Sequence, residues 1–279
     1  MPSMTEPTDD TLSADRIREL LPPAASGQLR ELTVLRETDS TNSELARLPA
    51  ERRHGHAVLA EEQTAGRGRR QRAWYSPAGG NVYLSLGWRF GTNSVPLSTL
   101  PLVAALCLCR ALDRIGLQGH GIKWPNDILV DGAKVAGILV ETQSAGSGPA
   151  RAVIGIGVNV RMPDSGAAGP GAVIDRPWTD LVSQLPPDRQ AVSRNELVAH
   201  LLEELLAGLA RFESQGFEVF HREWQARDLL TGKRLRLEGN GALRYGRAIG
   251  VDEDGGLEVD IDGYGPQILY AAEVSIYDD

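Results

Sequence analysis

A glycine-containing segment with four arginines, GRGRRQRAW at positions 66–74, is the part of the sequence best suited to hold an anion. Planar guanidinium groups match phosphate and carboxylate oxygens in pairs. Two glycines, Gly66 and Gly68, let the backbone approach a ligand closely because they lack a Cβ atom. The arginines are Arg67, Arg69, Arg70 and Arg72. Four like charges repel one another, so we expect this loop to be mobile until an anionic ligand binds.

Taken alone, the segment fits equally well a solvated basic loop or a contact for nucleic acid. The composition of the whole chain argues against nucleic acid, because 29 Lys and Arg residues are outnumbered by 37 Asp and Glu, for a formal net charge of -8. Non-specific duplex binding relies on a broad cationic surface instead. We therefore expect the basic loop to bind a small anion.

The segment KWPND, at positions 123–127, places an amide and a carboxylate where a predicted strand ends. Pro125 sets the turn, and Asn126 and Asp127 follow it, at a location where ligand-binding groups are common. Trp124 offers an aromatic face beside them. The alternative is a turn with a buried tryptophan, because turn residues of these types recur in many proteins.

Two apolar segments contain glycines inside predicted strands. In GAKVAGILVE, Lys134 stands near the strand start, and Gly137 indicates that another group approaches the backbone closely. In IGIGVNV, Gly155 and Gly157 precede Asn159. The alternative for Lys134 is that its side chain only extends from the strand start to place the ammonium group in water. Two glycines are weak evidence for a dinucleotide site, since neither a third glycine nor a helix follows.

The segment TDSTNSELA, at positions 38–46, runs from a predicted strand into the start of a helix. Ser40, Thr41 and Asn42 supply hydroxyl groups and an amide beside exposed backbone N–H groups. Such a set suits a neutral polar head group, for example a urea or an amide. Helix capping alone would also explain Ser40 or Thr41.

Strands and helices must alternate to position these segments. Period-two patterns predict strands at 33–37, 56–62, 81–90, 122–124, 127–130, 134–141 and 152–160. Helices are expected at 12–21, 40–47, 97–115, 178–184, 194–215 and 217–226. Pro22 and Pro23 should end the first helix, and Asp131-Gly132 should form a tight turn between antiparallel strands. The run SGAAGPGA at 165–172 is a loop by composition.

Past Arg227 the chain changes to short apolar runs separated by glycine-rich turns, which is typical of a small antiparallel β-barrel or sandwich. We expect a flexible N-terminal segment at 1–30, a large domain at 31–226 and a small β-domain at 227–279. The stretch before the first strand is too short for a three-helix DNA-binding domain.

Targeting signals and paired cysteines are not recognisable. No run reaches the roughly 20 apolar residues of a membrane span, and the polar N-terminus does not resemble an export signal. Cys107 and Cys109 lie two apart on a predicted helix and so do not face each other, which argues against a disulfide or a metal site. These features favour a protein of the reducing cytoplasm that binds neither DNA nor a membrane.

The five segments, in this order, closely resemble biotin protein ligases: STN, QTAGRGRRQRAW, KWPND, a lysine before AGILVE, and GIGVN. The resemblance extends from about Thr33 to the end of the chain. It implies an α+β fold, with a mixed sheet and packed helices of the kind seen in class II aminoacyl-tRNA synthetases and biotin and lipoate ligases. A small barrel similar to Src-homology-3 domains would follow.

The resemblance also implies a two-step reaction and its participants. Biotin and ATP, with Mg²⁺, would form biotinyl-5'-AMP, and biotin would then be transferred to one lysine of the biotin carboxyl carrier domain of a carboxylase. The first step brings two anionic groups together, the biotin carboxylate and the α-phosphate of ATP, so cations must screen their approach. No nucleophilic side chain is needed.

Roles for the candidate site residues follow from the same resemblance. Hydrogen bonds to the biotin rings would come from Ser40, Thr41, Asn42 and Gln63. The biotin tail and the phosphate would be held by Gly66, Arg67, Gly68, Arg69 and Lys134, and space for biotin would be left by Gly137 and Gly157. ATP would be contacted by Arg67, Arg69, Arg72, Trp74, Lys123, Asn126 and Asn159, with Trp74 stacking on adenine. Lys134, Arg69 and Asp127 are the candidates for catalysis, and the metal ligands are left unassigned.

One departure from the family pattern lies in the loop, where Gln71 replaces the third glycine of GRGRRGR. This replacement should stiffen the loop without removing charge. Lacking a DNA-reading extension, the chain resembles the monofunctional members. Three alternatives remain open: a lipoate or octanoate protein ligase, a biotin-binding protein without catalysis, and a nucleic-acid-binding protein.

Overall fold

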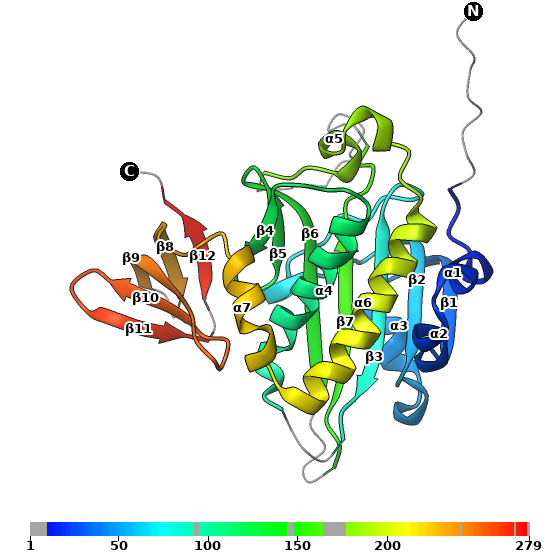
Figure 1. Cartoon of the computed structure of the whole chain (residues 1–279), viewed down its shortest axis with the longest axis horizontal. Helices are drawn as coiled ribbons and strands as arrows, with labels where there is room; N and C mark the ends of the chain where they lie inside the picture. The colour runs from blue at the N-terminus through cyan, green and yellow to red at the C-terminus, as the bar shows by residue number, and fades with distance from the viewer. Residues whose placement is uncertain are drawn as a thin grey trace, which may run out of the picture.

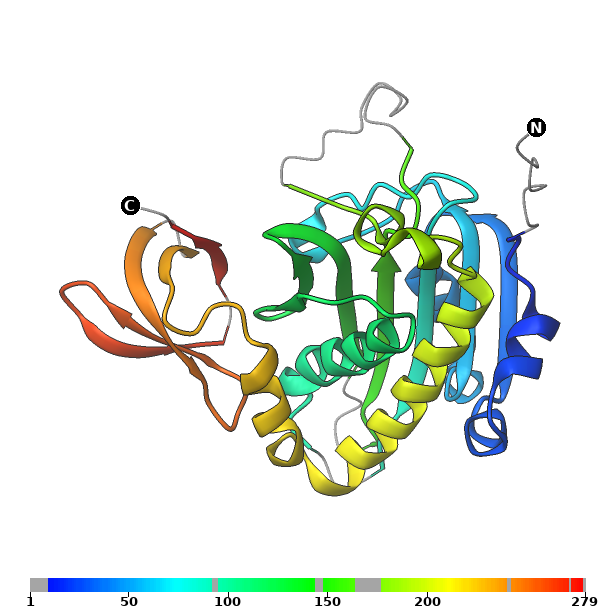
Figure 2. The ribbon, with the colours of Figure 1, turned by 45° about the horizontal axis from the view of Figure 1, so that its top comes forward.

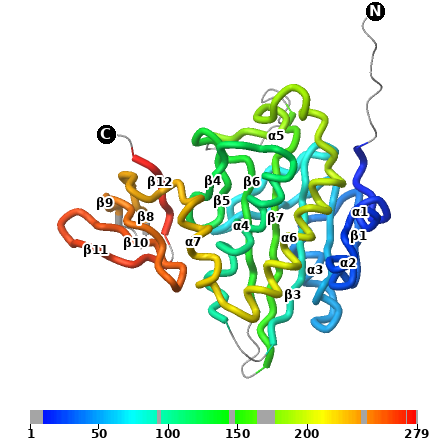
Figure 3. Tube along the Cα trace, in the orientation of Figure 1, coloured from blue at the N-terminus to red at the C-terminus, as the bar shows by residue number. Residues whose placement is uncertain are grey.

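The computed structural model describes residues 10–91, 95–143, 148–163, 177–239, 242–270 and 272–277. A seven-stranded sheet and a five-stranded sheet lie side by side, and helix α7 (Glu218–Arg227) leads from one to the other (Figure 1). The trace in Figure 3 runs from α1 and α2, at one side of the large sheet, to the C-terminal sheet at the opposite side.

The large sheet is mixed and places several site segments at one end. Its strands are β1 (Glu31–Thr38), β2 (His56–Gln63), β3 (Val82–Arg89), β4 (His120–Lys123), β5 (Asp127–Val130), β6 (Ala133–Gln143) and β7 (Arg151–Val158). Their order is β1-β2-β3-β7-β6-β5-β4, with β1 and β2 parallel and the other neighbours antiparallel. This pairing aligns Tyr83, Gly157, Gly137 and Asp127 in one row across four strands.

Helices cover both faces of the large sheet. On one face lie α4 (Leu100–Arg114) and α6 (Arg194–Gln215), as Figure 2 shows. On the other face lies α3 (Thr41–Arg47), whose Leu45 contacts Val58 and Val153 in a cluster separate from the main core. Their strand neighbours Ala57 and Ala152 belong to the main core. Successive strand residues point to opposite faces, so the two clusters lie on opposite sides of the sheet.

The remaining helices are short. They are α1 (Ala14–Leu20), α2 (Pro23–Gln28), α5 (Leu181–Gln184) and the 3-10 helices η1 (Ala50–Arg52), η2 (Arg69–Gln71), η3 (Leu97–Thr99) and η4 (Pro187–Arg189). None of the described helices is long and apolar enough to cross a membrane.

The C-terminal sheet is antiparallel and rests on the large domain. Its strands are β8 (Arg234–Gly239), β9 (Ala242–Val251), β10 (Leu257–Ile261), β11 (Gly265–Leu269) and β12 (Glu273–Ile276), in the order β11-β10-β9-β8-β12. Trp124 Nε1 donates a hydrogen bond of 3.0 Å to the carbonyl oxygen of Gly255. Because Trp124 belongs to KWPND, this bond links the C-terminal sheet directly to a site segment.

The structure confirms the expected fold class, and most predicted elements are present with small shifts of their ends. The helix predicted at 194–215 has these same bounds, and Asp131 and Gly132 have the positive φ angles, 48° and 78°, of a tight hairpin turn. Only the last four residues of the helix predicted at 178–184 are helical, because Trp178 instead pairs with Lys134 in an isolated β-bridge.

The helix predicted at 12–21 is present as α1, and it ends before Pro22 and Pro23 as expected. Pro23 also begins a second helix, α2, which was not predicted, since proline is well tolerated in the first turn. The segment expected to be flexible contains both α1 and α2, and Ile17 of α1 is fully buried. The tail at 1–9 and the loop predicted at 165–172 lie outside the described residues.

Candidate active site

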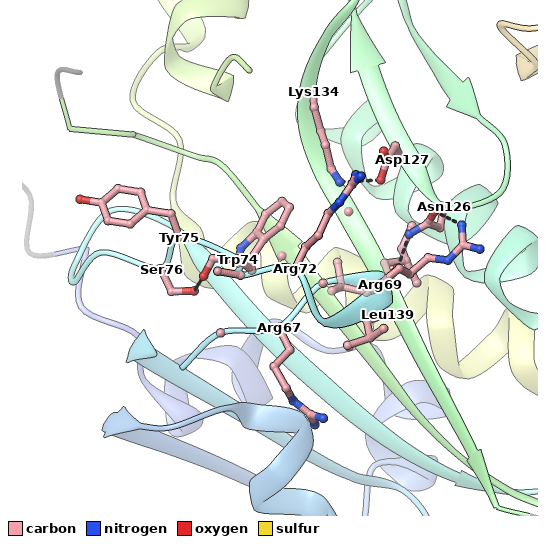
Figure 4. Close-up of a pocket in the computed structure, with 18 of the residues that line it drawn as sticks. Arg67, Arg69, Arg72, Trp74, Tyr75, Ser76, Asn126, Asp127, Lys134 and Leu139 are labelled. Atoms are coloured by element: carbon pink, nitrogen blue, oxygen red, sulfur yellow. Dashed lines mark hydrogen bonds and ion pairs between the residues drawn. The ribbon is translucent and has the colours of Figure 1, made fainter. Parts of the chain in front are cut away.

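A cavity of about 680 Å³ lies between the arginine loop and the end of the large sheet at which β2 and β7 end. Every residue assigned to the site from the sequence lines it: Ser40, Thr41, Asn42, Gln63, Gly66, Arg67, Gly68, Arg69, Arg72, Trp74, Lys123, Asn126, Asp127, Lys134, Gly137, Gly157 and Asn159. Figure 4 shows how side chains from the loop and from the neighbourhood of β5 and β6 meet there.

Backbone hydrogen bonds shape the arginine loop. The N–H of Trp74 donates to the carbonyl oxygen of Gly66 at 2.8 Å, and the N–H of Gly68 donates to that of Arg72 at 2.7 Å. Between these bonds, Arg70 and Gln71 have φ angles of 55° and 62°. Gln71 thus occupies a left-handed conformation that favours glycine, so its departure from the GRGRRGR pattern falls at a strained position.

Three of the four loop arginines are paired with carboxylates. The Arg67 guanidinium meets Glu141 through two contacts of 3.0 Å, while Arg70 and Arg72 meet Glu273 at 3.3 and 2.5 Å. The loop is therefore joined to β6 on one side and to β12 on the other.

Arg69 differs from the other loop arginines, because it has no ion pair among the residues that the structure describes. Its Nη1 donates to Oδ1 of Asn126 at 3.1 Å. Burial lowers the pKa of the Arg69 guanidinium, and the nearby Asp127 opposes that shift. Guanidinium groups remain charged in proteins, so Arg69 brings a partly desolvated cation to the cavity.

A chain of uncharged polar groups forms the floor of the cavity near α3. Ser85, which is fully buried, donates to Asn42 Oδ1 at 2.6 Å, and its Oγ lies 2.8 Å from Thr41 Oγ1, within hydrogen-bond distance. Gln63 Oε1 accepts from the N–H of Thr41 at 3.0 Å, and its Nε2 donates to Ser76 Oγ at 2.9 Å. We call this set the floor network. Ser40 is the N-cap of α3 but makes no capping bond with its side chain.

The opposite side of the cavity carries Lys134 and Asp127, whose Nζ and Oδ1 atoms lie 2.5 Å apart. The ammonium also lies 5.0 Å from the centre of the Trp74 ring, within the range of a cation–π interaction. In Figure 4 the side chain of Lys134 points toward Asp127. An anion that enters the cavity therefore meets a cation already oriented by a carboxylate.

Trp74 fills the space that the strand glycines leave. A Cβ atom on Gly157 would lie 2.6 Å from the Trp74 indole, and one on Gly137 would lie 3.1 Å from it. The glycines do admit another group close to the backbone, as expected, but in this structure that group is an aromatic ring of the protein. The indole Nε1 is buried and has no hydrogen-bond partner.

Asn126 and Asn159 use their amide groups within the protein. Asn126 Nδ2 donates to the carbonyl oxygen of Ile138 at 2.7 Å, and Asn159 Nδ2 donates to that of Thr179 at 3.1 Å. Asn126 also accepts from Arg69. Both residues line the cavity, but these bonds hold its wall together.

Sequence reasoning singled out Gly155 without giving it a role, and it missed three residues that contact the site residues: Ser85, Glu141 and Glu273. Ser85 gave no local signal, because the alternation of its strand places it on the more polar face, with Tyr83 and Arg89. Gly155 leaves room for the Asn42 amide, which a Cβ atom there would meet. Glu141 and Glu273 gave no local signal, because their partners lie 74 and 201 residues away in sequence.

Comparison with known proteins agrees with this geometry. The model of the "Biotin/lipoate A/B protein ligase family" matches residues 34–159. The biotin--[acetyl-CoA-carboxylase] ligase of Paracoccus denitrificans is 37% identical over 244 residues, which are 86% of this chain and 98% of that protein. The bifunctional ligase/repressor BirA of Salmonella typhimurium is 35% identical over 261 residues, covering 94% of this chain and 77% of the relative.

Among solved structures, the biotin protein ligase from Aquifex aeolicus in complex with biotin and ATP superimposes with a TM-score of 0.72 at 27% identity. The match covers 90% of this chain and 100% of that one. It includes both sheets, and the sequence relatives extend over most of the chain. This chain belongs to the biotin protein ligase family.

Proposed function

We propose that the protein joins biotin to ATP, forming biotinyl-5'-AMP and pyrophosphate, and then transfers biotin to one lysine of a biotin carboxyl carrier domain. The observation that carries this proposal is the division of one cavity into two chemically different ends. The floor network offers neutral donors and acceptors, and Arg69 with Lys134 offers cations. Biotin has the same division, with a neutral ureido ring at one end and a carboxylate at the other.

The first step needs cations where the two substrates meet. The biotin carboxylate attacks the α-phosphate of ATP, and both groups are anionic, so the barrier is largely electrostatic and positional. Lys134 is held by Asp127 at 2.5 Å, and Arg69 by Asn126 at 3.1 Å. Both cations are thus oriented before a substrate arrives. Neither needs to give up a proton.

A magnesium ion fits the donors that line the cavity. No cluster of three or more metal-binding side chains occurs in the described part of the chain. Mg²⁺ in nucleotide sites is commonly bound through one or two carboxylates plus substrate phosphates, so Asp127 and the amide oxygen of Asn126 would suffice. The ion, when bound, neutralises phosphate charge and favours departure of pyrophosphate.

The second step requires that the carrier lysine lose a proton before it attacks the mixed anhydride. Asp127 is 15% exposed as a side chain and lies on the cavity wall, so we assign it the role of orienting or deprotonating the incoming amine. The loop at 63–73 would cover the intermediate and exclude water until the carrier docks.

Three further expectations belong to this proposal. The domain boundaries are placed at 31–226 and 227–279. The net charge of -8 supports a protein that acts without DNA. Two buried free cysteines, Cys107 and Cys109, support a reducing compartment such as the cytoplasm.

The deciding experiment incubates the purified protein with biotin, ATP, Mg²⁺ and an apo carrier domain. Biotin-dependent release of pyrophosphate and a mass increase on a single carrier lysine are the expected results. Lipoate, added as a competitor, should not reduce the signal. Lys134→Gln should slow pyrophosphate release by about a hundredfold or more, the usual cost of losing a preorganised electrostatic group. The exposed Lys233→Gln serves as the matched control.

Absence of biotin-dependent pyrophosphate from folded protein would overturn the proposal. Preferential use of lipoate would assign the cavity to the other branch of the family. Biotin binding without pyrophosphate would indicate a protein that binds biotin but does not activate it.

A further inference from the structure

Glu141, near the end of β6, contacts two parts of the cavity that are otherwise separate. Its carboxylate receives two contacts of 3.0 Å from the Arg67 guanidinium, and its Oε2 accepts from Asn42 Nδ2 at 2.8 Å. Arg67 belongs to the arginine loop, and Asn42 belongs to α3 and the floor network. Within the part of the chain that the structure describes, Glu141 alone forms side-chain bonds with both Arg67 and Asn42.

Arg67 is oriented away from the anion-binding side. In Figure 4 its side chain points away from those of Arg69 and Arg72. Both of its terminal nitrogens contact Glu141, so the edge of the guanidinium that binds two oxygens at once is directed at this carboxylate. Arg67 therefore anchors the loop to β6 in this structure.

Asn42 has its amide orientation set by its neighbours. The side chain is 3% exposed and lies over Gly155. Its Oδ1 accepts from Ser85 at 2.6 Å, and its Nδ2 donates to Glu141 at 2.8 Å. The next acceptor for Nδ2 is the carbonyl oxygen of Leu139, at a longer 3.4 Å. Loss of Glu141 would thus leave the floor network without its best-placed acceptor.

From these contacts we infer that Glu141 is a positioning residue, which couples the placement of the arginine loop to the orientation of the floor network. The inference rests on the proposed function, because it takes the floor network to bind the ureido end of biotin. The Glu141 carboxylate holds the loop through Arg67 and orients the Asn42 amide. Each of these two contacts therefore stabilises the other. Biotin recognition and loop closure then support each other.

Two substitutions distinguish the contact of Glu141 with Arg67 from its contact with Asn42. Glu141→Gln keeps an oxygen that can accept from Asn42 but removes the charge that Arg67 meets, whereas Glu141→Leu removes both. The matched control is Glu203→Gln, which breaks a half-exposed pair with Arg114 away from the cavity.

The first measurement needs no ligand. Trypsin cleaves after arginine, and mass spectrometry follows cleavage within residues 67–72. Glu141→Gln and Glu141→Leu should both raise the cleavage rate about two- to fivefold, the size expected for loss of a half-exposed ion pair. Glu203→Gln should cleave at the wild-type rate. Matching urea unfolding midpoints would show that the variants are folded.

The second measurement uses the biotin-dependent release of pyrophosphate. Glu141→Leu should raise KM for biotin about tenfold, as expected for a buried amide that loses its acceptor. Glu141→Gln should change this KM by less than about threefold. KM for ATP and kcat should remain within about twofold in Glu141→Gln, because Arg67 then acts on loop placement and not on the phosphate.

Wild-type cleavage rates in both Glu141 variants would overturn the inference, as would an equal rise in biotin KM for both. Failure of the proposed function is a distinct result, since it would appear as a wild-type protein without biotin-dependent pyrophosphate. The tryptic comparison would still report on the contact between Glu141 and the loop.

Discussion

The shape of the cavity around Trp74 depends on the absence of a Cβ atom at Gly157 and at Gly137. Gly157 and Gly137 are paired across β7 and β6, and the indole lies on both. The same ring contacts the Lys134 ammonium, so the position of Trp74 also affects the principal cation of the site. A methyl group added under the ring would act on packing and electrostatics together.

The substitution Gly157→Ala should displace the Trp74 ring, because its Cβ atom would lie only 2.6 Å from the indole. Overpacking of this kind commonly costs about 1–3 kcal/mol, and the free energy of unfolding in urea measures it. Gly27→Ala is the control, because its Cβ meets no atom within 4 Å and lies in α2. Equal stability of the two variants would mean that Trp74 moves freely.

Arg69 should retain the adenylate, since it is the loop arginine without a carboxylate partner among the described residues. Arg69→Gly is expected to form biotinyl-5'-AMP but to release it about tenfold faster or more, the cost of a charge-assisted hydrogen bond. Release can be followed with radiolabelled ATP. Arg70→Gly is the comparison, because Arg70 already has the positive φ that glycine favours and is paired with Glu273.

Residue types in short segments predicted which residues line the cavity, because each segment carries its chemistry locally. Sequence could not show that Arg67 and Arg70 are already paired, since Glu141 and Glu273 reach them only through the folded sheets. Nor could it show that Trp74 lies on Gly157. Such contacts depend on tertiary structure, which local patterns do not contain.

Among the elements, α3 has the most direct effect on the site, because its first turn carries Thr41 and Asn42. Asp39 precedes this helix and stabilises its start. Its Oδ1 accepts from the N–H of Ser40 at 2.7 Å, and its carboxylate pairs with Arg47 from the last turn. The Arg47 hydrogen bond is the main cause that lowers the pKa of Asp39 to about 2.

This shift predicts an acid-dependent loss of stability. The folded pKa of Asp39 lies below its ordinary value of 3.8, so its stabilising effect is present above about pH 4 and is lost as pH falls toward 2. Asp39→Asn should flatten that part of the curve of unfolding free energy against pH. The pair is half-exposed, so the effect will be modest. The prediction would be contradicted if the free energy of unfolding fell equally at acid pH in the wild type and in Asp39→Asn.

Element types were largely predictable because strand and helix periods differ, as the match of α6 shows. Strand order was not predictable in this way. β7 lies between β3 and β6, and this placement alone puts Gly157 beside Gly137. The helix that begins at Pro23 was not predicted, because two adjacent prolines indicate a helix end locally, whereas the burial of Ala25 in the core depends on the folded structure.

At the scale of the molecule, both sheets contribute residues that line the cavity. Glu273 and Val274 of β12 line it, and Glu273 holds both Arg70 and Arg72. The Trp124 bond to Gly255 provides a second link between the sheets. The C-terminal sheet therefore takes part in placing the loop, beyond its own packing.

Glu273→Gln should loosen the loop without unfolding either sheet. Amide hydrogen exchange in residues 66–72 is expected to become faster, because the charge that holds two arginines is gone. Glu258→Gln on β10, which does not line the cavity, should leave exchange in this loop unchanged. Unaltered loop exchange in Glu273→Gln would show that the backbone bonds of the loop suffice.

The pairing of cations with carboxylates at the cavity has a thermodynamic consequence. Lys134, Arg70 and Arg72 have been taken partly out of water and matched with oxygen anions as the chain folds. A substrate phosphate then exchanges one oxygen partner for another and does not need to strip a full hydration shell. Part of the dehydration cost is met during folding, so ligand binding is left with a smaller reorganisation.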